Sequence, residues 1–357
     1  MAKGSLIRNL AAVILAAAMF AGAAMSVYAA KSADDNTDTL FTNDGDVNIY
    51  ITPDKYLYNF KGDNPGITIC GYVGDSGKLS FPSMINGRDV TAIEDNTFVN
   101  DDRITSVTMP GTLTVIGENC FNGCKNLSEV NLRGNVNEFR RVFCNCTSLK
   151  KMIFPQGVGS IISSFMNCTS LTYVRFSRSV STISDESFKG CTSLQSIEWL
   201  GSMTKLSDSF DGCTGLEEVV FPNGLIQIDG AFDGCTSLKN ILFPDTLLYI
   251  TGGFSDCSSL SELNLPAKLL FVNEAFNNCE ELSLLRSSKA TAISDTAFTG
   301  CPKLTIERES NTHWSIIGNL AVIAVGIIVG LLVYRYLSAK AKAIDRMKAS
   351  EEKEEQP

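Results

Sequence analysis

The chain has 357 residues, of which 44% are hydrophobic, and a formal net charge of -9 at pH 7. Such an acidic chain lacks the basic stripe that phosphate binding requires, so we exclude a nucleic-acid-binding protein. The single histidine, His313, lies outside the repeats described below, which removes His-based triads and His-rich metal sites from the main body of the chain. We expect neither a cofactor nor a metal.

The N-terminus is typical of an export signal. Lys3 and Arg8 form a short basic region, and residues 10–25 are almost wholly apolar. A small residue, Ala29, then stands where a signal peptidase would cleave. We therefore predict a signal peptide over residues 1–29. An uncleaved signal anchor is the alternative, and both send the rest of the chain across a membrane.

A second apolar stretch, residues 316–334, contains 19 residues and no charge. As a helix rising about 1.5 Å per residue, it would span roughly the hydrocarbon core of a bilayer. The segment that follows is rich in Lys and Arg up to Lys348, whereas the preceding flank is mixed. The positive-inside rule then predicts a single transmembrane helix, with the tail cytoplasmic and the middle of the chain extracellular.

Between these segments, phenylalanine recurs at a spacing of 22 or 23 residues. Three residues after nine of the ten positions stands a cysteine. Self-similarity at such a period indicates a solenoid built from equivalent coils. Leaving aside the first position, Phe98, the repeated pairs are Phe121 and Cys124, Phe143 and Cys146, Phe165 and Cys168, Phe188 and Cys191, Phe210 and Cys213, Phe232 and Cys235, Phe254 and Cys257, Phe276 and Cys279, and Phe298 and Cys301.

Each unit continues with an alternating apolar segment, such as Leu216, Val219 and Phe221, which predicts a short, half-buried parallel strand. Several of these strands end at a proline, for example Pro222, which has no N–H to donate to a ladder. The second position after each Phe is Gly, Asn or Asp, the residue types that adopt a left-handed turn most readily.

This unit resembles the BspA-like (Treponema-type) leucine-rich repeat, with its signature of an apolar strand, Pro, Val-x-x-Ile and Ala-Phe-x-x-Cys-x-x-Leu. The resemblance covers about Gly66 to Ile306. It implies an α/β-type repeat solenoid, a leucine-rich-repeat horseshoe of about ten repeats with short parallel strands, to which the sequence adds one transmembrane helix. Trp199 to Gly201 replaces the usual strand-end proline, and Ser287 occupies an apolar strand position, so we expect local irregularity there.

Twelve cysteines in an exported chain would ordinarily indicate disulfides. Nine of them, however, occupy one equivalent site per coil, where parallel side chains do not supply disulfide geometry readily, so we predict a column of buried thiols. Cys120 and Cys144 lie outside that column, and a bridge between them is an open alternative. Zinc binding through Cys144 and Cys146 would need further ligands that the spacing does not offer.

The outward strand positions form a two-column grid that we interpret as the binding face. Within it, Lys151, Ile153, Tyr173 and Arg175 combine an aromatic, an aliphatic and basic residues on adjoining rungs, the mixture enriched at protein-binding hot spots. Val220 and Leu242 form a second apolar spot. The alternative is that these are ordinary strand-forming residues on a sheet surface.

We therefore predict a plasma-membrane protein whose repeats bind an extracellular macromolecule, most directly a protein, in the manner of an adhesin. The rivals are a self-associating component of the cell envelope and, more remotely, a surface hydrolase using carboxylates such as Glu217 with Glu218 or Glu280 with Glu281. The predicted organisation is a signal peptide (1–29), an acidic leader and N-terminal cap (30–78), the solenoid (79–306), a membrane-proximal linker (307–315), the transmembrane helix (316–334) and a cytoplasmic tail (335–357).

Overall fold

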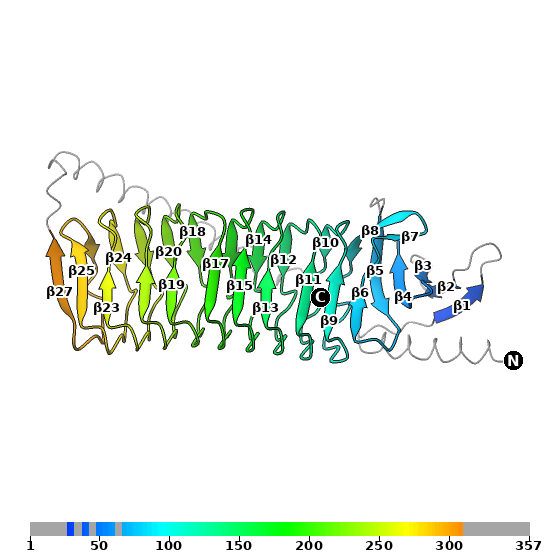
Figure 1. Cartoon of the computed structure of the whole chain (residues 1–357), viewed down its shortest axis with the longest axis horizontal. Helices are drawn as coiled ribbons and strands as arrows, with labels where there is room; N and C mark the ends of the chain where they lie inside the picture. The colour runs from blue at the N-terminus through cyan, green and yellow to red at the C-terminus, as the bar shows by residue number, and fades with distance from the viewer. Residues whose placement is uncertain (1–26, 32–37, 43–47, 61–65, 310–357) are drawn as a thin grey trace, which may run out of the picture.

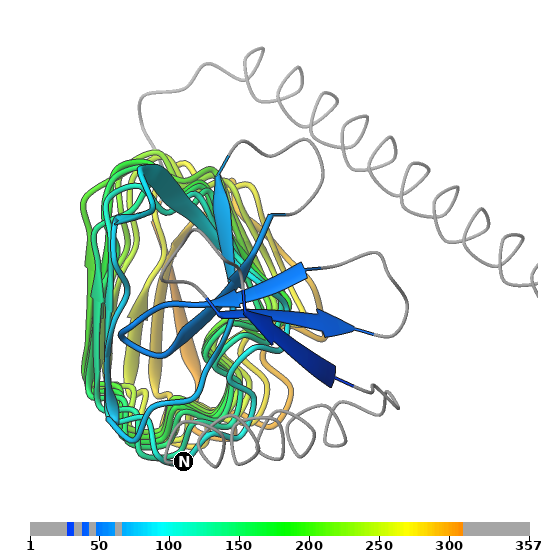
Figure 2. The ribbon, with the colours of Figure 1, turned by 90° about the vertical axis from the view of Figure 1, so that its right-hand side faces the viewer.

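The computed structural model describes residues 27–31, 38–42, 48–60 and 66–309, and every regular element in them is a β-strand. The repeats form an elongated stack of coils, one behind the other (Figure 1). Seen along its length, successive coils overlap closely and enclose a single interior (Figure 2). The predicted solenoid of short parallel strands is confirmed.

The first strand of each coil contributes to one wall of the stack, which we call the first face. Neighbouring strands pair parallel with matching positions in register, for example Tyr173 opposite Lys151. The first-face strands are β6 (Lys78–Ser80), β9 (Ser106–Met109), β11 (Glu129–Leu132), β13 (Lys151–Ile153), β15 (Tyr173–Phe176), β17 (Ser196–Trp199), β19 (Glu218–Val220), β21 (Asn240–Leu242), β23 (Glu262–Asn264), β25 (Leu284–Ser288) and β27 (Thr305–Glu309).

A second parallel strand in each coil builds another wall, the second face. Its middle residue points inward, as Ile228 does in β20, where it is fully buried. The second-face strands are β8 (Arg88–Ile93), β10 (Val115–Ile116), β12 (Glu138–Arg140), β14 (Ser160–Ile162), β16 (Thr182–Ser184), β18 (Lys205–Ser207), β20 (Gln227–Asp229), β22 (Tyr249–Thr251), β24 (Phe271–Asn273) and β26 (Ala292–Ile293).

The N-terminal end of the stack is covered by an antiparallel meander (Figure 2). It ends in β5, which pairs parallel with β8 of the first coil. Tyr56 fixes the meander to the first face, because its hydroxyl donates to Ser80 O (2.8 Å) and accepts from Ser80 N (3.0 Å). The remaining strands here are β1 (Val27–Lys31), β2 (Asp38–Thr42), β3 (Asn48–Ile51), β4 (Tyr56–Asn59), β5 (Ile67–Tyr72) and β7 (Met84–Ile85).

The repeated phenylalanines form one continuous column inside the stack. From Phe98 to Phe298, successive ring centroids are 5.0–5.5 Å apart and the rings are nearly parallel. Offset stacking of this kind adds to the free energy gained by burial. The 23-residue coils keep the column intact, since Phe165 and Phe188 are 5.1 Å apart; the extra residue lies at the preceding corner, where Asp185 and Glu186 both have positive φ.

The prediction of an α/β-type horseshoe is wrong, because the described coils contain no helix and their second apolar pair lies at a strand. The turn after the column residue shows why a helix does not form. Cys213 N donates to Phe210 O (3.2 Å), as in a single helical turn, but Gly212 between them has a φ of +66°. A left-handed residue ends a helix. Every coil has such a residue at this position, as the sequence predicts, with φ between 57° and 79°.

No helix in the described residues is long and apolar enough to cross a membrane. The fold class is therefore an all-β solenoid for this part of the chain, without the transmembrane helix that the sequence-based class included. Residues 316–334, where that helix was predicted, lie outside the described residues, as does nearly all of the predicted signal peptide.

Replacing one ring of the column tests whether the stack depends on it. Phe210 is fully buried between Phe188 and Phe232. Phe210→Ala should lower the free energy of unfolding by about 3–5 kcal/mol, because it removes buried apolar surface and leaves a cavity. Phe271 lies on the second face and is 38% exposed. Phe271→Ala is the matched control and should cost less than about 1 kcal/mol in urea unfolding; equal losses would contradict a specific column.

Candidate functional site

The first face brings the four residues of the predicted binding patch together on two adjacent strands. Lys151 lies opposite Tyr173, and Ile153 lies opposite Arg175, in the parallel register of β13 and β15. Inward-facing Met152 and Val174 alternate with them and are buried. Because alternate residues of a strand point to opposite sides, burial of that pair turns the patch residues outward. Lys151 is exposed, and the Ile153 side chain is 46% exposed.

A residue of the next strand completes this patch, and the sequence reasoning did not include it among the site residues. Glu198 in β17 lies opposite Arg175. Its carboxylate accepts a hydrogen bond from the Tyr173 hydroxyl and another from Arg175 Nε (2.9 Å), while Arg175 Nε also donates to the Tyr173 hydroxyl oxygen (3.1 Å). These donors hold the pKa of the Glu198 carboxyl below its usual range. We call Lys151, Ile153, Tyr173, Arg175 and Glu198 the β13–β17 patch.

The bonds within the β13–β17 patch fix the orientation of Arg175. Only Nε of the guanidinium is engaged, so within the described residues both Nη nitrogens are free to donate. Arg175 therefore presents a planar pair of donors at a defined position, the geometry that matches a carboxylate in two simultaneous bonds. Pre-orientation also reduces the side-chain entropy lost when a partner binds.

The second predicted spot, Val220 and Leu242, is also assembled as expected. These residues are register partners in β19 and β21 and are 53% and 49% exposed. The strand β17, with Ser196 and Glu198 outward, separates this apolar pair from the basic strands of the β13–β17 patch. The first face thus carries two different surfaces within five coils.

The acidic pairs considered for hydrolysis do not face one another across a common site. Glu217 forms an ion pair with Lys239 (3.0 Å), and Glu281 forms one with Lys303 (2.6 Å), in each case between neighbouring coils on the surface. A glycosidase requires two carboxylates on either side of one scissile bond. Glu217 and Glu281 belong instead to surface pairs that link one coil to the next.

The column cysteines have a role that the spacing alone did not reveal. Each thiol is free, and its Sγ donates to the main-chain oxygen of the column Phe one coil before, at 3.0–3.5 Å; Cys213 to Phe188 O, at 3.3 Å, is typical. Burial raises the pKa of these thiols, to about 12 for Cys191. A thiol held protonated is a poor nucleophile, so the column is structural.

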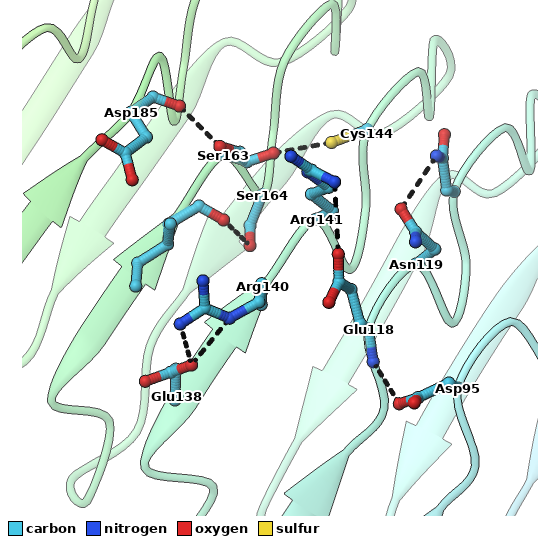
Figure 3. A network of polar contacts seen from close by, with 12 residues as sticks. Asp95, Glu118, Asn119, Glu138, Arg140, Arg141, Cys144, Ser163, Ser164 and Asp185 are labelled. Carbon is cyan, nitrogen blue, oxygen red and sulfur yellow. Dashed lines mark hydrogen bonds and ion pairs between the residues drawn. The ribbon is translucent and has the colours of Figure 1, made fainter. Parts of the chain in front are cut away.

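Cys120 and Cys144 are both free and buried in this structure. Figure 3 shows the Cys144 thiol directed at Ser163, to whose main-chain oxygen it donates (2.6 Å). Burial raises the pKa of Cys144 to about 11, although the Arg141 charge acts in the opposite direction. Within the ranges that the structure describes, no three His, Cys, Asp or Glu side chains are placed to hold a metal ion.

Aspartates stack along one corner of the central coils, directly after the column Phe. The Oδ1 of Asp211 accepts from Asp233 N (3.3 Å), and the Oδ1 of Asp233 accepts from Ser255 N (2.7 Å). Burial, and then the nearby Asp233 charge, raise the pKa of Asp211 to about 6. Asn277 occupies the same position two coils beyond Asp233 and makes the same bond, to Thr299 N (3.1 Å), without a charge.

The repeats match the family model described as a BspA type leucine-rich repeat region. The match comprises six copies over residues 91–209 and 206–305, which is more than half of the chain. The chain therefore belongs to the BspA-type leucine-rich-repeat family, as its Phe and Cys spacing indicated.

Solved structures of the same kind resemble the stack. A leucine-rich-repeat protein from Bacteroides ovatus is 24% identical, covers 73% of this chain and 71% of its own, and superposes with a TM-score of 0.62, which supports the fold. A leucine-rich-repeat protein from T. pallidum is 26% identical over 59% of this chain and 90% of its own, with a TM-score of 0.44. No curated protein matches the chain.

The reactivity of the column thiols tests their burial. The eight buried ones, Cys124 through Cys279, should react with a polar maleimide at pH 8 at least about 100-fold more slowly in the native protein than after unfolding, because they are both inaccessible and protonated. Peptide mapping after timed labelling measures this. All twelve thiols should react in denaturant without reductant; a deficit of two or more would contradict the free-thiol assignment.

The raised pKa of Asp211 predicts a pH-dependent effect on stability. Because its pKa is about 6 when folded and about 3.9 when unfolded, this group favours folding most at low pH and loses that contribution as pH rises through 6. Asp211→Asn should therefore stabilise the protein at pH 7.5, by about 1 kcal/mol after allowing for partial exposure. The gain should vanish near pH 4.

Thermal unfolding at the two pH values measures the effect of Asp211→Asn. Asp245→Asn, at an exposed turn, controls for the loss of one negative charge. A stabilisation that is equal at both pH values, or equal in the control, would contradict a buried carboxylate at position 211.

Proposed function

We propose that this protein is exported, held at the membrane by residues 316–334, and binds an extracellular protein through the β13–β17 patch of its first face. The observation that carries the proposal is the oriented Arg175, whose Nε is bonded to Glu198 while its Nη nitrogens face outward beside exposed Ile153. Arginine, tyrosine and an exposed aliphatic side chain in one place are the components of a protein-binding hot spot.

The arrangement of the stack supports binding rather than catalysis. Inward positions are occupied by the Phe, Cys and aliphatic columns, which leaves the outward positions of the first face free to vary from coil to coil. A partner that lies along the first face would contact several coils at once. The Val220 and Leu242 pair, two and three strands beyond β15, then offers a second, apolar contact to the same partner.

Attachment to the membrane is supported by the sequence. An apolar start that ends in small residues and an uncharged 19-residue segment followed by basic residues are typical of an exported, single-pass surface protein. The adhesin-like role is supported by this placement and by membership of a repeat family whose architecture suits macromolecular binding, although a fold alone specifies no ligand.

The binding of the full chain, in lipid nanodiscs, to proteins released from the surface of neighbouring cells tests the proposal. A captured partner is then titrated against variants. Arg175→Ala should weaken binding about tenfold or more, because it removes the oriented donor pair. The expected order of affinity is wild type, then Tyr173→Ala, then Arg175→Ala.

The matched control is Arg286→Ala, since Arg286 lies in the same outward column and pairs with Glu262 and Glu307, far from the patch. It should leave the affinity unchanged. Equal weakening by both variants would remove the patch from the binding site. If the wild type captures no partner and instead forms oligomers, the self-associating envelope component is correct.

A further inference from the structure

The C-terminal end of the stack, unlike the N-terminal end, exposes interior positions of the last coil. Ile306 continues the inward column of the first face, where the preceding members Leu263 and Leu285 are 1% and 0% exposed. Ile306 itself is 44% exposed. Phe298, Leu304 and Ile293 are also partly exposed, whereas their equivalents one coil before are fully buried: Phe276, Leu282 and Val272.

One corner of this end is already closed by a polar residue. Arg308 lies opposite Ser287 in the register of β25 and β27, at the position that Leu265 and other apolar residues hold in earlier coils. Its Nη1 donates to Thr291 O (3.1 Å), which covers that corner. The rest of the end, around Ile306 and Phe298, has no such cover within the described residues.

The chain leaves the described region at this end. Strand β27 finishes at Glu309, and six residues, 310–315, separate it from the apolar segment at 316. They extend about 20 Å at most, enough to turn back along the five-residue β27 and far too little for another coil. Five of the six are small or polar, and one, Trp314, is large and apolar.

We propose that residues 310–315 fold back over the last coil as a cap, with the Trp314 indole covering Ile306 and Phe298. A terminal cap with a polar outer surface and an apolar inner contact is what a stack of coils requires at each end. The charged residues Glu307, Arg308 and Glu309 of β27 oppose the alternative of strand pairing with a second copy, since charges on an edge strand discourage such pairing. The cap would also cover Cys301, the partly exposed last thiol of the column.

The reactivity of Cys301 reports on the cap in the full chain. Cys70 is the other partly exposed thiol, so Cys70→Ser provides the background. Labelling with a polar maleimide, followed by peptide mapping, gives the rate at Cys301 in detergent micelles and in nanodiscs. Trp314→Ala should raise that rate about tenfold, because the end of the stack then opens freely. Trp314→Phe should preserve most of the protection, and Thr312→Ala should preserve all of it.

A second variant separates contact from a general loss of structure. Ile306→Ala should raise the Cys301 rate as well, and the double variant should add little, because both changes break one contact. The eight buried column thiols should remain unreactive in every variant. Protection that is unaffected by Trp314→Ala would overturn the proposal. So would protection seen only in nanodiscs, which would identify lipid as the cover, or protection lost on dilution, which would identify a second copy.

Discussion

The structure depends on placing each coil directly over the one before it. A period of 22 residues brings every column Phe within 5.0–5.5 Å of its neighbours, and the same period aligns the column thiol with the Phe oxygen one coil earlier. Neither interaction exists within a single coil. A lone coil therefore loses backbone entropy without burying both sides of its apolar layer, and stability arises only from stacking.

This constraint separates the residues that maintain the fold from those that are free to serve function. Inward positions repeat because each must fit the same position above and below. Outward positions of the first face carry no such requirement, and they differ from coil to coil, from Lys151 and Tyr173 to Val220 and Leu242. Binding specificity is therefore expected in the outward columns, set by a rigid scaffold.

Much of the solenoid followed from the sequence because its period is visible there. Once Phe210 and Phe232 occupy equivalent positions, the parallel register and the left-handed turn at Gly212 follow, and so does the adjacency of Ile153 and Arg175. The helix implied by the resemblance was wrong because the left-handed residue between Phe and Cys stops each turn. The bonds from Glu198 and from the thiols depend on side-chain directions that spacing does not encode.

Deleting one whole coil tests the stacking account most directly. Removal of residues 210–231 places Phe232 over Phe188 and preserves the register, whereas removal of residues 210–220 deletes half a coil and breaks it. In urea unfolding followed by circular dichroism, the account predicts that the first variant folds to the same β structure, with an m-value lower by about a tenth. The second should lose cooperative unfolding. Equal behaviour of the two variants would contradict the account.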